Sequence, residues 1–189
     1  MDHPLKSTPG TYALLLGLQV PIELQVGRLG RIHFESPFYL YFGSAFGSGG
    51  LRARIAHHLH PARRAHWHID YLRQFAEVVG VWYTYDEVRL ECTWANAAPM
   101  LRGASQVPRF GSSDCRCQTH LLAVNRLPSL SAFRRQLNAL RSGHARIRQL
   151  DMKRRNGKEP DSLRRGRLFH KEVQANWHED TSGELTLTV

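Results

Sequence analysis

The chain has 189 residues, a length that suits one domain or a compact core with an extension. Hydrophobic residues make up 42% of the chain and aromatic residues 10%, which excludes wholesale disorder. Lys and Arg number 26 against 16 Asp and Glu, so the formal net charge is +10. This excess predicts a polyanionic partner, most commonly nucleic acid, with an acidic membrane surface as the alternative.

Two further protein classes are excluded by the sequence. No apolar run approaches the ~20 residues of a membrane-spanning helix, so we expect no membrane partner. The three cysteines cannot all pair within one chain, which argues against a disulfide-stapled secreted protein. Reduced cysteines are typical of the cytoplasm, and we therefore predict a cytoplasmic location.

Short apolar or alternating segments, bounded by Gly and Pro, predict β-strands before residue 125. The predicted strands are residues 11–18, 22–26, 31–34, 38–42, 77–85 and 121–124. Apolar residues at helical spacing predict a helix over residues 51–59, and a short helix is expected over residues 67–75. Asp86 is a suitable N-cap for a third helix over residues 87–102.

The composition changes after residue 125, which predicts a core over residues 9–125 and a basic extension over residues 126–189. Residues 1–125 carry 12 basic and 9 acidic side chains, a net of +3, whereas residues 126–189 carry 14 and 7, a net of +7. The extension is therefore the expected source of general affinity for nucleic acid.

Three segments are predicted within the extension: an amphipathic helix over about residues 129–150, a basic arm over residues 153–171, and a short tail that could form an edge strand. A solvated charged helix with a disordered arm is the alternative interpretation. The predicted nucleic-acid contacts are Arg52, Arg134, Arg135, Arg141, Lys153, Arg154, Arg155, Arg164 and Arg165.

Three blocks in the core carry a pattern that points to chemistry. They are Gly10-Thr11-Tyr12, Tyr41-Phe42-Gly43, and Leu51 followed by Arg54 and His58. In order and residue type these blocks resemble the GIY-YIG nuclease superfamily, with Thr11 and Phe42 in place of the two isoleucines. The gap between the first two blocks is longer than in the smallest members and has room for an extra hairpin over residues 19–35.

Further blocks resemble one uncharacterised branch of that superfamily, whose members occur alone or fused to a base-excision glycosylase of the endonuclease III type. These blocks are residues 39–45, 66–71, 91–92 and 110–121. The resemblance covers residues 9–125. It implies an α+β fold, an α/β sandwich with a central mixed, mainly antiparallel sheet flanked by helices, to which the basic helical extension is added.

The resemblance implies metal-dependent cleavage of phosphodiester bonds. Glu91 stands where the superfamily has a metal-binding carboxylate, and oxygen ligands favour Mg²⁺ or Mn²⁺. Arg54 would clamp the scissile phosphate through its forked guanidinium. Tyr12 is the preferred base and Tyr41 a supporting hydroxyl, while His58 would hydrogen-bond the tyrosine or the phosphate. Because a free tyrosine has a pKa of about 10, a nearby cation, Arg54 or the metal or both, is needed for a base near pH 7.

Each of these residues also has an ordinary structural explanation. Tyr12 and Tyr41 could be strand aromatics, and Arg54 could be a solvated helix arginine. His58 could serve packing, and Glu91 could take part in an ion pair.

Other polar residues of the core are less well defined. The superfamily often has an asparagine late in its core, and this chain has no obvious counterpart, which leaves Ser112, Ser113 or Asp114 as candidates for phosphate support. A dense group of histidines near His66, with Asp70, could be a metal site or a polar wall beside nucleic acid.

All three cysteines fall into a second cluster of potential ligands. Cys92, Cys115, Cys117 and His120 are a candidate tetrahedral zinc set, although their spacing is unusual for a zinc knuckle. The alternative is that these are small, buried, reduced residues, because free cysteine packs well. A structural Zn²⁺ is therefore one of two open interpretations.

Three functions are compatible with the sequence. The leading hypothesis is a metal-dependent endonuclease that acts on DNA (or RNA), in repair, processing or defence. The second is a non-catalytic nucleic-acid-binding module of the same fold that works with a repair or processing partner. The third is a zinc-containing interaction domain whose basic arm binds protein or membrane.

Overall fold

The structure is a computed structural model that describes residues 5–60 and 64–152 with their side chains, and residues 177–179 and 185–187 as strands. The chain divides into two compact units, Met1–Lys153 and Arg154–Val189. The predicted basic arm over residues 153–171 lies outside the described residues.

The first unit is built on a six-stranded sheet with the strand order β6-β7-β4-β1-β5-β8. Each neighbouring pair in this sheet is antiparallel, and β1 lies in its interior between β4 and β5. The strands are β1 (Thr11–Leu18), β4 (Phe38–Ser44), β5 (Ala76–Thr84), β6 (Ala104–Gln106), β7 (Leu121–Val124) and β8 (Arg148–Asp151).

Alternate residues of β1 pack into two different hydrophobic cores. Tyr12, Leu14 and Leu16 belong to one buried cluster. Ala13 and Leu15 belong to the other. Successive side chains of a strand point to opposite faces of the sheet, so a strand with both faces covered needs apolar side chains at every position. This requirement explains the uninterrupted apolar run that follows Thr11.

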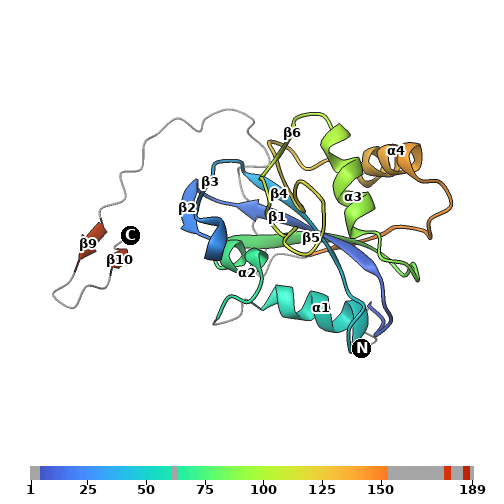
Figure 1. The fold of residues 1–189 in the computed structure, drawn as a ribbon, viewed down its shortest axis with the longest axis horizontal. Helices are drawn as coiled ribbons and strands as arrows, with labels where there is room; N and C mark the ends of the chain where they lie inside the picture. Colours follow the sequence, from blue (N-terminus) through green and yellow to red (C-terminus); the bar gives the residue numbers. More distant parts are fainter. Residues whose placement is uncertain (1–4, 61–63, 153–176, 180–184, 188–189) are drawn as a thin grey trace. The chain divides into compact units, whose positions relative to one another are not determined.

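Helices cover both faces of the sheet, α1 and α2 on one side and α3 and α4 on the other (Figure 1). The first pair contributes Leu51, Ile55, Ile69 and Leu72 to one core. The second pair contributes Trp94, Phe133 and Leu137 to the other. The helices are α1 (Gly50–Leu59), α2 (His68–Arg73), α3 (Glu91–Ala97) with the short 3₁₀ helix η2 (Ala98–Met100), and α4 (Leu130–Leu140).

This arrangement confirms the predicted α+β sandwich with a central sheet flanked by helices. The expected sheet was mixed and mainly antiparallel, and the described sheet is antiparallel at every pairing. Within the described ranges, no helix combines the length and the apolar character that crossing a membrane would need.

Two smaller pairs of strands complete the described secondary structure. β2 (Ile22–Gln25) and β3 (Arg31–Phe34) form an antiparallel hairpin around the 3₁₀ turn η1 (Gly27–Leu29), which confirms the hairpin expected over residues 19–35. In the second unit, β9 (Trp177–Glu179) pairs with β10 (Leu185–Leu187), so the tail does contain a strand.

The predicted helix over residues 87–102 is wrong in its start and its length. α3 begins at Glu91, and the carboxylate of Asp86 does not cap it. That carboxylate accepts a hydrogen bond from the backbone N of Ala145 at 2.8 Å. The backbone N of Leu90 donates to the Thr11 hydroxyl at 2.9 Å, which fastens the start of α3 to β1.

The predicted helix over residues 129–150 is correct at its start and wrong at its end. Ser129 caps α4 through its side-chain oxygen, and the helix ends at Leu140. Gly143 has a φ of +77°, a left-handed conformation that interrupts helical geometry. The apolar residues beyond it do not continue the helix, because residues 148–151 form β8, which pairs with β5.

The segment after residue 125 is therefore part of the sandwich up to the end of β8. α4 packs on the sheet, and the first compact unit extends to Lys153. The first unit ends beyond the predicted core boundary at residue 125, because the apolar residues of α4 cover a face of the sheet that would otherwise be exposed.

We expect Phe133→Ala to destabilise the first unit strongly. The Phe133 ring is fully buried and stacks on Trp82 at a centroid distance of 5.1 Å and on Phe42 at 5.9 Å. Its removal should lower the free energy of unfolding by about 3–5 kcal/mol, measured by urea denaturation. Leu140→Ala, at a residue that is 47% exposed, is the matched control and should stay within about 0.5 kcal/mol of the parent. Equal effects of the two substitutions would contradict the placement of α4.

Candidate active site

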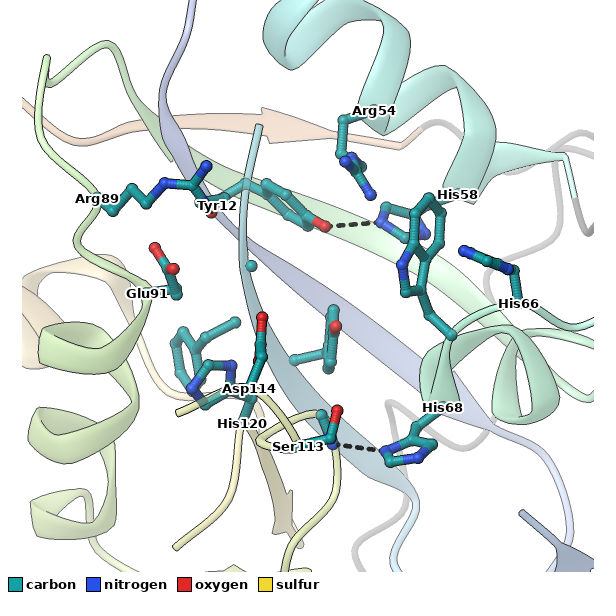
Figure 2. Close-up of a pocket in the computed structure, with 16 residues that line it drawn as sticks. Tyr12, Arg54, His58, His66, His68, Arg89, Glu91, Ser113, Asp114 and His120 are labelled. Carbon is teal, nitrogen blue, oxygen red and sulfur yellow. Dashed lines mark hydrogen bonds between the residues drawn. The ribbon is translucent and has the colours of Figure 1, made fainter. Parts of the chain in front are cut away.

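One cavity of about 380 Å³ collects all five residues that were predicted to be catalytic. Its size lies in the range of ligand sites in proteins. In Figure 2, the labelled side chains of Arg54 and His58 lie on one side of the cavity and that of Glu91 on the other, with Tyr12 between them. The lining residues among the predicted set are Tyr12, Tyr41, Arg54, His58 and Glu91.

The two tyrosines come from neighbouring strands and lie on the same face of the sheet. Tyr12 of β1 is opposite Gly43 of β4, and Leu14 is opposite Tyr41, so the two rings stand two positions apart. A Cβ atom at Gly43 would lie 2.5 Å from the Tyr12 hydroxyl oxygen. A glycine is therefore required there for the Tyr12 ring to lie against the backbone of β4.

His58 and Arg54 lie one turn apart on α1, which directs both side chains toward the cavity. The Tyr12 hydroxyl and His58 Nε2 are 2.7 Å apart and form a buried hydrogen bond. Both side chains are 2% exposed. This bond joins the central strand to α1 and fixes the positions of the two groups.

Burial controls the protonation states of these groups. Desolvation, followed by the proximity of Tyr41, raises the pKa of Tyr12 well above its ordinary value, although Arg54 acts in the opposite direction. Desolvation likewise raises the pKa of Tyr41. The pKa of His58 is lowered to about 3, mainly by burial and further by His57. Arg54 alone therefore does not make Tyr12 acidic, and the Tyr12–His58 pair is neutral at physiological pH.

Arg54 is held in place by stacking. Its guanidinium carbon lies 4.3 Å from the centroid of the Trp67 ring, a cation–π contact. Trp67 is held in turn by Asp70, a buried carboxylate that accepts hydrogen bonds from the backbone N atoms of His66 and Trp67, both at 2.9 Å. The Arg54 side chain is half-buried and lines the cavity, so its charge is available to a bound anion.

Glu91 is the first residue of α3, and its position depends on Thr11 through the hydrogen bond to Leu90. Among the described residues, three buried side-chain polar atoms lack a hydrogen-bond partner, and Glu91 Oε2 is one of them. The other two are His58 Nδ1 and Trp94 Nε1. A buried carboxylate oxygen without a donor is costly unless something else satisfies it, so this atom is open to a cation.

The structure adds Arg89 to the cavity, a residue that the sequence analysis did not name, together with Trp67 and His68 of the block over residues 66–71. Arg89, exposed, lines the cavity and donates to the Ser44 hydroxyl at 3.4 Å. Trp67 and His68 also line it, and the backbone N of Gly111 donates to His68 Nδ1 at 3.0 Å. No spacing in the sequence pointed to Arg89, which lies in the loop that had been predicted as helix.

Asp114 and Ser113, two of the three candidates for phosphate support, reach the cavity from the segment of residues 107–120. Ser112 is buried and is not among the lining residues. The Asp114 carboxylate and the Glu91 carboxylate point into the same space below Tyr12 (Figure 2). Two carboxylates and two arginines, Arg54 and Arg89, therefore line the same cavity.

The second predicted cluster is also brought together. The ligand atoms of Cys92, Cys115, Cys117 and His120 all lie within 4.8 Å of one another. Cys92 follows Glu91 on α3, and His120 lines the cavity, so this cluster adjoins the candidate active site.

The structure describes four of the nine predicted nucleic-acid contacts. Arg52, Arg135 and Arg141 are exposed. Arg134 is half-buried and donates to the backbone O of Ile147, so it is engaged within the fold rather than free on the surface. The remaining predicted contacts lie outside the described residues: Lys153, Arg154, Arg155, Arg164 and Arg165.

Residues 11–142 match the model of a protein family described as "Domain of unknown function DUF123". Because this match spans more than half of the 189 residues, the chain belongs to that family. The matched range includes α4, in agreement with its packing on the sheet. Among curated proteins and among solved structures, none matches the chain.

We expect His58 to make the folded state sensitive to acid. Its folded-state pKa of about 3 lies below its ordinary value of 6.5, so between these values only the unfolded chain takes up the proton. Stability contributed by neutral His58 is present above pH 6.5 and is lost as the pH falls toward 3. The expected slope of the free energy of unfolding is about 1.4 kcal/mol per pH unit in this window.

Urea denaturation of the parent and of His58→Gln between pH 4 and pH 7 measures how much His58 contributes to the pH dependence of the free energy of unfolding. The expected contribution corresponds to the uptake of about one proton on unfolding. His58→Gln should flatten the pH dependence by that amount, whereas His60→Gln, at the exposed residue that follows α1, should leave it unchanged. A pH dependence that His58→Gln does not alter would contradict the neutral, buried state of this imidazole.

Proposed function

We propose that this protein is a metal-dependent endonuclease of the GIY-YIG type that hydrolyses phosphodiester bonds in DNA. The observation that carries the proposal is the presence of Tyr12, Tyr41, Arg54, His58 and Glu91 around one cavity. These residues come from two strands and two helices that are distant in the sequence. Hydrolysis of a phosphodiester needs an activated water, neutralised charge at phosphorus and support for the leaving oxygen, and each requirement has a candidate group here.

Arg54 is the proposed clamp for the scissile phosphate. A guanidinium presents parallel N–H donors that match two phosphate oxygens, which a lysine cannot do. The stacking of Arg54 on Trp67 at 4.3 Å restricts its orientation before the substrate arrives. Arg89, which lines the same cavity, would contact an adjacent phosphate or the same one from the opposite side.

Glu91 is the proposed ligand of a divalent metal. The unpartnered Oε2 atom supplies a free carboxylate position, and the Asp114 carboxylate faces the same space. Oxygen donors of this kind fit Mg²⁺ or Mn²⁺. When bound, such an ion would neutralise the charge that develops on the phosphate and on the leaving oxygen.

Tyr12 is the proposed general base, acting together with His58. The Tyr12 hydroxyl donates its proton to the unprotonated His58 Nε2 at 2.7 Å while its oxygen accepts a proton from the attacking water. The pKa of His58 is low because of burial and, further, because of His57 and Arg54. A phosphate bound to Arg54 would offset that positive charge and so favour protonation of the imidazole.

The basic extension is proposed to supply general affinity for nucleic acid. Residues 153–171 carry 8 basic and 2 acidic side chains, a net of +6. Such a segment binds phosphates without reading sequence.

The proposed partners are DNA, with RNA as the alternative polymer, and a repair enzyme. Three free cysteines fit a cytoplasmic location, where thiols stay reduced.

A second candidate function is a non-catalytic nucleic-acid-binding module of the same fold. The observation in its favour is that burial raises the pKa of both Tyr12 and Tyr41, so that neither hydroxyl is ionised near neutral pH. In that case Arg54 and Arg89 would bind phosphate without cleavage. The two candidates differ in whether Glu91 matters for more than binding.

We expect Glu91→Gln to abolish Mg²⁺-dependent cleavage while binding of the same DNA is kept. The substitution preserves the size of the side chain but removes the charge that holds the metal, so the rate should fall by about 10²–10³-fold or more. Cleavage is measured on single-stranded, duplex, branched and damaged DNA, and on RNA, with binding followed by fluorescence anisotropy. Arg54→Lys should also lose most cleavage, because the forked contact is lost although the charge remains.

The matched control for Glu91→Gln is Glu87→Gln, an exposed carboxylate in the preceding loop that should cleave like the parent. Equal cleavage by the parent and Glu91→Gln would contradict the proposal that Glu91 binds the metal. Tight binding by the parent without cleavage of any of these substrates would instead favour the non-catalytic module.

We expect the basic arm to determine the salt dependence of binding. Replacing Arg164 and Arg165 by Gln should make the slope of log K against log salt shallower by about 1.8 on duplex DNA, because each lost phosphate contact removes about 0.9. The matched control replaces Arg28 and Arg31, which are exposed and lie within the β2–β3 hairpin, and should not change the slope. Identical slopes for the parent and the Arg164/Arg165 variant would contradict the role of the arm.

A further inference from the structure

The cluster of sulfur and nitrogen ligands beside Glu91 joins two segments that are far apart in the sequence. Cys92 comes from the first turn of α3, whereas Cys115, Cys117 and His120 come from the loop that precedes β7. His120 Nε2 lies 3.8 Å from Cys92 Sγ and 3.4 Å from Cys115 Sγ. The four ligand atoms all lie within 4.8 Å of one another.

The two sulfur–nitrogen separations match those expected for ligands around one tetrahedral ion. With Zn–S bonds of about 2.3 Å and Zn–N bonds of about 2.0–2.1 Å, neighbouring sulfurs lie about 3.8 Å apart and sulfur and nitrogen about 3.6 Å apart. The observed sulfur–nitrogen distances of 3.4 and 3.8 Å bracket the second value. The four ligand atoms, all within 4.8 Å of one another, are close enough to be ligands of one ion.

The chemistry of the set selects the metal. Three thiols and one imidazole are soft or borderline donors, which favour zinc over Mg²⁺ or Mn²⁺. The chain has three cysteines, and all three are in the cluster and free of disulfides. Simple packing would not require all of them, with a histidine nitrogen, to direct their ligand atoms at one point.

We propose that Cys92, Cys115, Cys117 and His120 bind one zinc ion that fastens the loop of residues 107–120 to the start of α3. A complete set of four protein ligands leaves no position for water or substrate, so the ion is structural rather than catalytic. The site is distinct from the carboxylate site at Glu91. The proposal does not rest on the cleavage activity, because it follows from the ligand geometry alone.

The zinc ion would stabilise a segment that has little regular structure of its own. The loop is held at other points by hydrogen bonds from Phe42 N to His120 O at 2.9 Å and from Gly111 N to His68 Nδ1 at 3.0 Å. It carries Asp114 and Ser113 into the cavity. Glu91 precedes the zinc ligand Cys92 in the first turn of α3, and Asp114 precedes the zinc ligand Cys115. By joining Cys92 to Cys115, zinc would therefore set the distance between Glu91 and Asp114.

The zinc content of the full-length protein tests this proposal. Protein expressed with added zinc and purified without chelators should contain about one zinc per chain by atomic emission, and replacement by Co²⁺ should give the sulfur-to-cobalt charge-transfer absorption of a thiolate site. Cys117→Ser and His120→Asn should lose most of this zinc. His33→Asn, at an exposed histidine on β3, is the matched control and should keep it.

A second measurement uses the parent protein, so it remains decisive if the variants fail to fold. A mercurial reagent that titrates thiols should release one zinc ion as the three cysteines react, with the ion detected by a chromogenic chelator. Prior removal of zinc should make the thiols react faster and should lower the melting temperature. Purified protein with zinc far below one per chain, or thiols that react at once without releasing zinc, would overturn the proposal.

Discussion

The candidate site depends on the central position of β1 in the sheet. This strand pairs with β4 on one side and β5 on the other, and helices cover both of its faces, so its side chains alternate between two buried cores. Tyr12 consequently points toward α1, where it meets His58, and the preceding Thr11 hydroxyl binds the backbone of Leu90. Two consecutive residues of one strand thus position both the tyrosine and the start of the helix that carries Glu91.

The same burial that fixes these groups also sets their chemistry. Removal from water keeps Tyr12, Tyr41 and His58 neutral, because it raises the pKa of a phenol and lowers the pKa of an imidazole. Charge in the cavity comes from Arg54 and Arg89 and from Glu91 and Asp114, which all line it. A phosphate and a cation that entered together would balance these charges and would change the electrostatic surroundings of the neutral pair. The proposed reaction therefore requires its ligands to complete the site.

Local patterns in the sequence predicted those parts of the fold whose burial is set by local periodicity. The limits of β1 and the span of α1 agree with the apolar run after Thr11 and with the spacing of Leu51 and Ile55. α3 and the segment beyond Leu140 differed, because hydrogen bonds to distant residues decide where these elements begin and end. All of the predicted catalytic residues line the cavity. Arg89 could not be predicted as a cavity residue from the sequence, because its position depends on a loop without regular structure. The proximity of Cys92 to Cys115 likewise depends on tertiary contacts.

The central claim is that one cavity holds both the scissile phosphate and the divalent cation. Anomalous diffraction from Mn²⁺ in crystals grown with a cleavage-resistant DNA analogue tests this claim most directly. The account predicts a manganese peak at the Glu91 carboxylate and a backbone phosphate in contact with the Arg54 guanidinium. DNA bound on another surface, with neither manganese nor phosphate in the cavity of Tyr12 and His58, would contradict it.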